Sequence, residues 1–181
     1  MDVRPGVYDS DNVTGADNQQ ERLDGYIAGY VDGEGSFSVS VQRNSSCRVG
    51  FQLIPEFHVS QNGDRAQVLE MIRDPLGCGY INPNSKRDRA LVLVVRERQA
   101  LLERVIPFFE RVPILSAKQA DFGKFADIVR RMALGHHLTP AGFGELLELA
   151  LSMNGSGRFR KVRWNELVAA QNPQRLYAGQ G

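Results

Sequence analysis

Ile27-Ala28-Gly29-Tyr30-Val31-Asp32-Gly33-Glu34-Gly35 is the stretch of sequence around which the rest of the chain is organised. Gly25, Gly29 and Gly33 recur at intervals of four, so they share one face of a predicted helix. Glycine inside a helix costs about 0.5–1 kcal/mol relative to alanine, so three on one face indicate a structural need. We expect a second helix to pack very close to this stripe, because a surface without side chains lets two backbones approach.

Two acids lie where this predicted helix ends, Asp32 and Glu34, separated by Gly33. Carboxylates at the C-terminal end of a helix oppose its macrodipole. The arrangement therefore favours a positively charged partner at this end, such as a metal ion. The alternative is a helix packed within its own domain, with two acids that are simply solvated.

Residues 27–35 resemble the LAGLIDADG motif of homing endonucleases, with Ile27 in place of Leu and Glu34 in place of the final Asp. In that family two motif helices pack side by side about a two-fold or pseudo-two-fold axis. Their last acids meet and bind divalent metal over the DNA. Only one such motif is found in this sequence, so the resemblance implies a homodimer whose interface includes Gly25, Gly29, Gly33 and Asp32.

The chain of 181 residues is expected to form one domain over residues 20–170, with a disordered leader over residues 1–19 and a flexible tail over residues 171–181. Residues 1–34 hold eight acids and two arginines, a net charge of −6. Because the whole chain has 22 bases and 21 acids, the remaining residues carry a net charge of +7. Such a basic body is compatible with phosphate binding, although many proteins that bind no nucleic acid share it.

The composition excludes several other classes. Cys47 and Cys78 lack the spacing of a zinc site and are expected to be free thiols in a reducing compartment. No stretch approaches the roughly 20 apolar residues that span a bilayer, so no membrane partner is expected. The first residues are acidic and polar, unlike a signal peptide. We therefore expect an intracellular protein, in the host cytoplasm or an organelle.

After the motif, Phe37, Val39 and Val41 alternate with polar residues, which predicts a strand over residues 36–42 with one buried and one polar face. A hairpin turn and a return strand over residues 48–61 follow, with Pro55 at a bulge or an edge. A short helix over residues 65–73, strands near residues 77–81 and 91–95, and helices near residues 98–109, 116–132 and 140–151 complete the pattern.

This αββαββα order is that of the LAGLIDADG domain, and the resemblance covers roughly residues 22–153. It implies an α+β fold with a saddle-shaped antiparallel sheet and extra C-terminal helices. A polar sheet face beside a metal-binding helix is interpreted as a surface that reads base edges in the major groove of double-stranded DNA. Simple solvation of that face is the alternative.

The resemblance implies a set of catalytic residues. Glu34 and the carbonyl of Gly33 are the expected ligands of Mg²⁺ or Mn²⁺, whereas the first acid, Asp32, is usually structural. Gln61 is implied to position the attacking water, and Arg65 to lie near the scissile phosphate. Both are also ordinary surface residue types, so a turn and helix-surface role is the alternative.

In the family, a basic residue lies in the loop before the helix that corresponds to the one starting near Ser116 in this chain. Lys118 is the only lysine in this segment and is the candidate for the catalytic role. The register is open, because the chain carries extra residues between Pro107 and Lys118. Ser116 is the other position that aligns with the family lysine.

Base contacts are assigned from strand parity and from the basic tip of the second hairpin. Pro55 is a potential shift in that parity, which affects His58 most. The predicted DNA-binding residues are Ser38, Ser40, Gln42, Arg48, Gln52, His58, Arg87 and Arg89.

The favoured function is a site-specific, intron-encoded homing endonuclease that makes metal-dependent double-strand breaks at a long, near-palindromic target as a homodimer. The rival is a non-catalytic LAGLIDADG protein, either a maturase with intron RNA as its partner or a DNA-binding regulator. A third hypothesis is a dimeric interaction protein without nucleic acid. Retention of Glu34, Gln61, Arg65 and Lys118 favours the nuclease.

Overall fold

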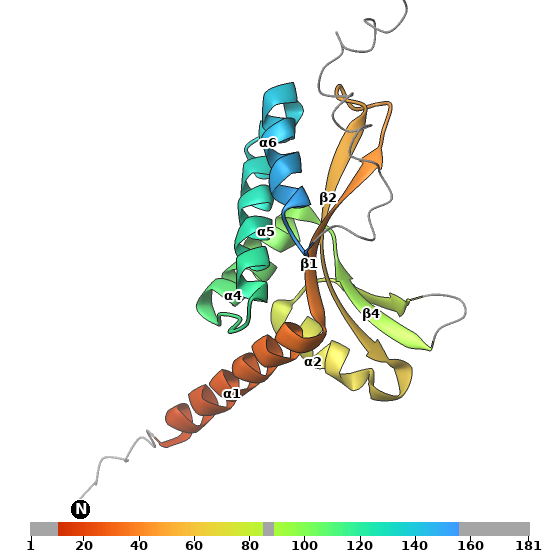
Figure 1. Cartoon of the computed structure of the whole chain (residues 1–181). Coiled ribbons are helices and arrows are strands. Elements are labelled where there is room, and N and C mark those ends of the chain that lie inside the picture. Colours follow the sequence, from red (N-terminus) through yellow and green to blue (C-terminus); the bar gives the residue numbers. More distant parts are fainter. Residues whose placement is uncertain (1–10, 85–88, 156–181) are drawn as a thin grey trace, which may run out of the picture.

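The computed structural model describes residues 11–84 and 89–155, with side chains from residue 15 onward. An antiparallel sheet and its covering helices follow one another in the predicted αββαββα order, and two further helices follow (Figure 1). The elements are α1 (Asp11–Glu34), β1 (Gly35–Arg43), β2 (Phe51–Asn62), η1 (Gly63–Arg65), α2 (Gln67–Leu76), β3 (Tyr80–Pro83), β4 (Ala90–Val95), α3 (Arg98–Ala100), η2 (Leu101–Val105), α4 (Ile106–Arg111), α5 (Lys118–Ala133), η3 (His136–Leu138) and α6 (Pro140–Leu151).

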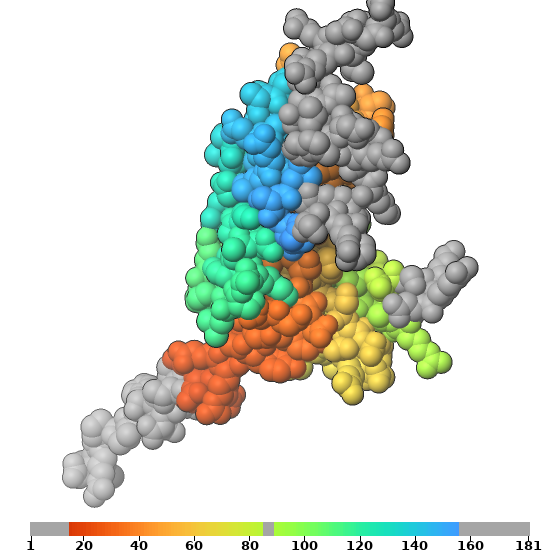
Figure 2. Space-filling model, in the orientation of Figure 1, coloured from red at the N-terminus to blue at the C-terminus, as the bar shows by residue number. Residues whose placement is uncertain are grey.

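Helix α1 begins earlier than the sequence pattern predicts. A disordered leader over residues 1–19 is wrong for residues 11–19, which are helical, while residues 1–10 lie outside the described part. The first half of α1 protrudes from the body of the molecule (Figures 1 and 2). Periodicity missed it because an exposed arm needs no apolar stripe.

The sheet has the strand order β1-β2-β4-β3, and all neighbouring strands are antiparallel. Strand β2 pairs with β1 along the whole of β1, with Phe37 opposite Phe57. It pairs with β4 only over residues 57–62. From Phe51 to Val59 the odd-numbered residues of β2 are buried, and the even-numbered ones from Gln52 to Ser60 are partly exposed, so the two faces of the sheet differ as period two predicts.

The core lies between the odd face of the sheet and the helices. The ring of Phe37 packs within 5.1 to 5.4 Å, centroid to centroid, of Phe109 on α4 and of Phe122 and Phe125 on α5. The Phe57 ring joins this cluster, 5.2 Å from Phe37. Helices α4 and α5 cover this face, whereas the even-numbered residues of β1 and β2 on the opposite face are partly or fully exposed among the described residues, and we call that side the open face.

Pro55 causes no bulge, since the β1–β2 register runs through the Val39–Pro55 pair without a shift. It lies just before the part of β2 that pairs with β4, which is an edge position as predicted. The return strand starts at Phe51 instead of Arg48. Gly50 has a φ of 72° and accepts a hydrogen bond from the Asn44 N–H, so the hairpin turn reaches as far as Gly50.

Two prolines lie inside helices that the sequence pattern ends too early. Helix α2 continues past Pro75 to Leu76, and Gly77 in the left-handed conformation ends it by donating to the carbonyls of Arg73 and Asp74. The predicted helix over residues 98–109 runs to Arg111 and contains a π-helical turn at 101–105 just before Pro107. A proline lacks the N–H of a regular helical turn, which accounts for the local widening.

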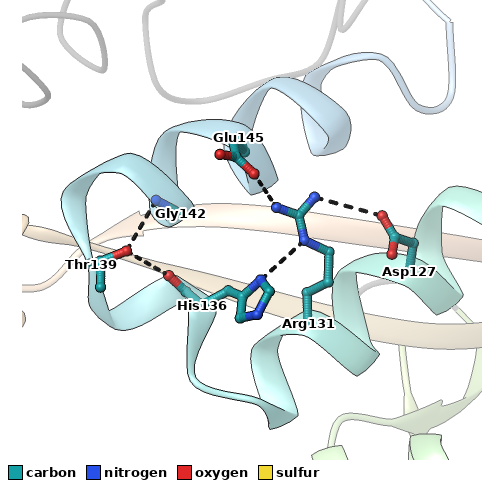
Figure 3. Close-up of polar contacts among 6 residues, drawn as sticks. All are labelled: Asp127, Arg131, His136, Thr139, Gly142 and Glu145. Carbon is teal, nitrogen blue, oxygen red and sulfur yellow. Dashed lines mark hydrogen bonds and ion pairs between the residues drawn. The ribbon is translucent and has the colours of Figure 1, made fainter.

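Polar contacts hold α6 against α5 (Figure 3). Thr139 accepts a hydrogen bond from the Gly142 N–H at 3.1 Å, so Thr139 is the N-cap of α6 and Pro140 its first residue. Arg131 on α5 contacts Glu145 on α6 and donates to Nδ1 of His136 at 3.4 Å. His136, in the short η3 turn between the two helices, therefore also contacts α5 through Arg131.

No helix within residues 11–84 and 89–155 combines the length and the apolar character needed to cross a membrane. The predicted basic stretch after residue 157, the short helix near residues 164–169, the flexible tail at 171–181 and the position of Arg87 lie outside the described residues.

Candidate functional site

The end of α1 passes directly into β1, with no loop between Glu34 and Gly35. The backbone is so close here that a Cβ atom on Gly35 would lie 2.6 Å from a Val31 side-chain atom and 2.8 Å from its carbonyl oxygen. Glycine is therefore required at this position. Gly33 and Glu34 are exposed, so the junction presents the second acid of the motif to the outside.

Asp32 has a different role from Glu34. Its carboxylate accepts hydrogen bonds from both the N–H and the hydroxyl of Ser116, with the N–H at 3.1 Å. The Ser116 hydroxyl oxygen in turn accepts from the N–H of Lys118 at 3.1 Å. Asp32 thus ties the segment before α5 to the end of α1, and this geometry agrees with a structural role.

The ammonium of Lys118 lies at the same junction. Its Nζ donates to the carbonyl oxygens of Val31 at 2.8 Å and Gly35 at 2.6 Å. Burial lowers the pKa of Lys118 from its ordinary value, and the negative charges of Asp32 and Glu34 oppose that shift. Of the two positions left open by the sequence, Lys118 brings its charge to the motif, whereas Ser116 binds Asp32.

Tyr30 connects the motif helix to Gln61. The side-chain amide of Gln61 donates to the Tyr30 hydroxyl. Burial raises the pKa of Tyr30 above 10.0, the Gln61 hydrogen bond opposes this, and Glu34 and Arg65 add smaller effects of opposite sign. Since all three side chains act on one hydroxyl, the structure brings Glu34, Gln61 and Arg65 to one region.

Sequence reasoning missed Tyr30, although the signal was present. Tyr30 precedes Glu34 by four residues, which places both on the same side of α1. It also missed Asp24, a buried carboxylate that accepts from Arg111 at 2.9 Å and from Gln20 at 2.7 Å. Arg111 lies at the end of α4, so this pair fixes α1 against the body.

The three-glycine stripe, Gly25, Gly29 and Gly33, is open in the protomer. All three glycines are exposed, and a Cβ atom on any of them would meet nothing within 4 Å. Ile27, Ala28 and Val31 on the other side of α1 are buried in the core. The described residues of the protomer therefore do not explain the stripe, and its contact with a second helix stays a prediction.

The open face of the sheet carries the even-numbered residues of β1 and β2. Ser38 pairs with Glu56, Ser40 with Ile54 and Gln42 with Gln52. His58 lies on this face too, because Pro55 causes no shift in parity. Five of the predicted base-contacting residues thus share one face: Ser38, Ser40, Gln42, Gln52 and His58.

The predicted arginines are placed differently. Arg48 lies in the turn between β1 and β2 and is exposed, so strand parity does not apply to it. Arg89 is exposed just before β4. Both are at loop ends of the sheet, from which a long cationic side chain can reach phosphates.

The oxygen donors at the junction fit a hard divalent cation. Exposed carboxylate and backbone carbonyl oxygens at Glu34 and Gly33 are ligand types that Mg²⁺ and Mn²⁺ prefer. Within residues 15–84 and 89–155, no three His, Cys, Asp or Glu side chains gather into a metal site. Because Asp32 already binds Ser116, Glu34 is the motif carboxylate that remains exposed for such a cation.

Known proteins resemble this chain both in sequence and in structure. The family model described as LAGLIDADG endonuclease matches residues 27–129. "Homing endonuclease I-ApeII" of Aeropyrum pernix is 33% identical over 107 residues, which are 59% of this chain and 62% of that protein. The chain thus spans slightly less than two thirds of the length of that curated relative.

Two solved structures show the same fold. The crystal structure of "a homing endonuclease, I-TnaI" aligns with a TM-score of 0.71 and 36% identity, over 81% of this chain and 94% of that one. The "I-LtrWI LAGLIDADG homing endonuclease bound to target DNA" aligns with a TM-score of 0.73 and 28% identity. That match covers 88% of this chain but only 49% of the I-LtrWI chain.

Proposed function

The chain belongs to the LAGLIDADG endonuclease family, and we propose that it is a site-specific DNA endonuclease that makes metal-dependent double-strand breaks as a homodimer. One observation carries the proposal: the exposed three-glycine stripe runs directly into the exposed Glu34. Two copies packed along this stripe bring two Glu34 side chains together. The site is then completed by the second copy of the same chain.

The similarity in length supports the homodimer. The chain matches 94% of I-TnaI but about half of I-LtrWI, so two copies of this fold are needed to match the larger protein. Helix packing supports the homodimer as well. Three glycines in a helix lower its stability, and close packing of a partner helix on the stripe would offset this cost. A two-fold axis through the stripe implies a near-palindromic DNA site.

Glu34 and the Gly33 carbonyl would hold Mg²⁺ or Mn²⁺, which would supply Lewis-acid polarisation of a phosphodiester and a bound water of lowered pKa. Lys118 contributes positive charge beside Glu34, where the phosphate becomes more negative during hydrolysis. Gln61 is held by Tyr30 with its amide fixed, as a residue that orients water requires. Arg65 is exposed nearby and neutralises phosphate charge.

The open sheet face supports DNA as the substrate. Uncharged polar side chains in register on β1 and β2 match the two-stranded ribbon that the major groove accepts. The I-LtrWI relative is described as bound to target DNA, and its fold is shared. Exposed Arg48 and Arg89 at the loop ends are suited to the flanking phosphates.

The test compares wild type with Glu34→Gln, and with Glu148→Gln as an exposed control on α6. The probe is a duplex that spans an uninterrupted insertion site, incubated with Mg²⁺ or with EDTA. We expect double-strand cuts by wild type and Glu148→Gln only with Mg²⁺, and binding without cuts by Glu34→Gln. Cleavage by Glu34→Gln at the wild-type rate contradicts the assignment, and salt-sensitive binding without any cleavage favours the non-catalytic rival.

A further inference from the structure

A charged cluster occupies the open face of the sheet and has no part in the catalytic site. Glu56 lies in the middle of β2, and the β2–β4 register places Arg96 opposite it, one step beyond the Phe57–Val95 pair. The Nε of Arg96 donates to one carboxylate oxygen of Glu56. Nδ1 of His58 lies 3.2 Å from the other oxygen, and Tyr80 on β3 acts electrostatically on Arg96. We call these four residues the Glu56 cluster.

Within the Glu56 cluster, the carboxylate is much less exposed than the guanidinium that it binds. The side chain of Glu56 is 20% exposed, whereas that of Arg96 is 57% exposed. The carboxylate thus lies low on the sheet, and the guanidinium stands higher. The nearby His58 ring and the Arg96 guanidinium lower the pKa of Glu56 against the effect of burial, so the carboxylate stays ionised at neutral pH.

A carboxylate on a face that meets DNA repels phosphates unless a cation neutralises it. The Glu56–Arg96 pair has no net charge, so Arg96 gains little from a phosphate contact that any arginine can make. Directional hydrogen bonds remain, because the bond through Nε leaves donors on the terminal guanidinium nitrogens. Guanine offers the matching pair of acceptors, O6 and N7, in the major groove.

We propose that Arg96 reads a guanine in each half-site and that Glu56 is the positioning residue that holds the guanidinium for it. This inference rests on the proposed DNA endonuclease function. The anchoring has an energetic reason, since an arginine fixed before binding loses less rotamer freedom when it meets the base. The pairing also favours specificity. If Arg96 turned away to bind a phosphate, the Glu56 carboxylate would lose its partner, which disfavours that contact.

The test measures binding and requires no cleavage. The full chain is used to select bound sequences from a randomised duplex pool in EDTA, and dissociation constants of the selected duplex and its single-base variants are measured at several salt concentrations. We expect a strong guanine preference at one position of each half-site. Arg96→Met and Arg96→Lys remove it, with a loss of about 5- to 150-fold in discrimination at that position.

Glu56→Gln is expected to weaken the same preference while Arg96→Lys retains affinity for other sequences. Arg130→Met is the matched control, because Arg130 pairs with Glu110 on the helical side of the molecule. Unchanged guanine preference in Arg96→Met overturns the inference. So does a uniform loss of affinity with a salt slope reduced by about one, which indicates a phosphate contact. A shift of preference at a cytosine in Glu56→Gln alone also overturns it, since Glu56 is then the reader.

These outcomes are separable from a failure of the proposed function. A protein that selects sequences through Arg96 but never cuts them supports the inference and contradicts the endonuclease. A protein that cuts its target but retains the guanine preference in Arg96→Met does the reverse. Circular dichroism of each variant verifies folding, and Arg96, as an exposed residue beyond β4, is expected to tolerate substitution.

Discussion

The ammonium nitrogen of Lys118 lies 2.6 Å from the carbonyl oxygen of Gly35, the residue at which the motif helix becomes the first strand. It bonds the Val31 carbonyl as well, so one side chain from α5 binds both sides of the junction. A cation at the C-terminal end of a helix interacts favourably with the macrodipole. The lysine proposed for catalysis therefore also supports the backbone that presents Glu34.

Lys118→Met tests both roles. We expect cleavage to fall at least about 100-fold, because positive charge beside the scissile phosphate is lost. The free energy of unfolding should fall by about 1–2 kcal/mol, because two carbonyls lose a charged donor. Lys124→Met is the matched control, since Lys124 lies on the same helix and donates to the Ser152 carbonyl at 2.8 Å. Equal cleavage by both variants would contradict the catalytic role.

Gly29→Leu tests the homodimer. A side chain at Gly29 meets nothing within the protomer, so folding should be preserved, and the helix should gain up to about 1 kcal/mol in propensity. A leucine nonetheless blocks close approach of a second helix, so we expect monomers by analytical ultracentrifugation and loss of cleavage. Gly123→Leu on α5, which also meets nothing within 4 Å, should remain a dimer. A dimeric Gly29→Leu variant would place the interface elsewhere.

Much of the fold followed from local patterns in the sequence. Period two in residues 36–42 gave a strand with Phe37 in the core and Ser38 on the open face, because side-chain direction in a strand alternates regardless of the remaining structure. The Thr139-Pro140 start of α6 was predictable for the same reason, since capping is a local interaction. Burial of Ile27 and Val31 opposite an exposed glycine stripe agrees with the motif.

The remaining features depend on contacts between distant residues. The arm at residues 11–19 has no apolar stripe, and two helices that the sequence ends at residues 73 and 109 continue to Leu76 and Arg111. Ser116 bonds Asp32 across 84 residues of sequence, so composition could not indicate its partner. The family resemblance indicated Lys118 as a catalytic candidate, but not that its ammonium contacts backbone carbonyls. The Glu56–Arg96 pair requires the β2–β4 register, which sequence alone did not provide.

A double-mutant cycle on Asp32 and Ser116 tests the tie between the motif and α5. Asp32 accepts two hydrogen bonds from Ser116, so Asp32→Asn and Ser116→Ala should each destabilise the protein by about 1 kcal/mol. We expect the double variant to be less destabilised than the sum, with an interaction energy of at least about 0.5 kcal/mol by denaturant unfolding. Strict additivity would mean that the contact contributes nothing. The variants that lose the most stability should also lose the most cleavage activity, because Ser116 also binds the N–H of Lys118.

The pH dependence of unfolding tests the charge state of Glu56. The nearby His58 ring and the Arg96 guanidinium lower its pKa from 4.5 in the folded protein, so its carboxylate form stabilises the fold. This stabilisation is fully present above pH 4.5 and is lost as the pH falls through the lowered pKa. Wild type should therefore be more stable than Glu56→Gln near pH 6, by about 1 kcal/mol or less because the pair is partly solvated. The difference should shrink as the pH falls below 4.5 and disappear once the pH is below the lowered pKa of Glu56. Unfolding is measured without DNA at one protein concentration, because dimerisation shifts the apparent stability.

Glu110→Gln, at the more exposed ion pair with Arg130, should change stability little at either pH. A difference for Glu56→Gln that persists unchanged into acid would show that the carboxylate charge does not stabilise this face of the sheet.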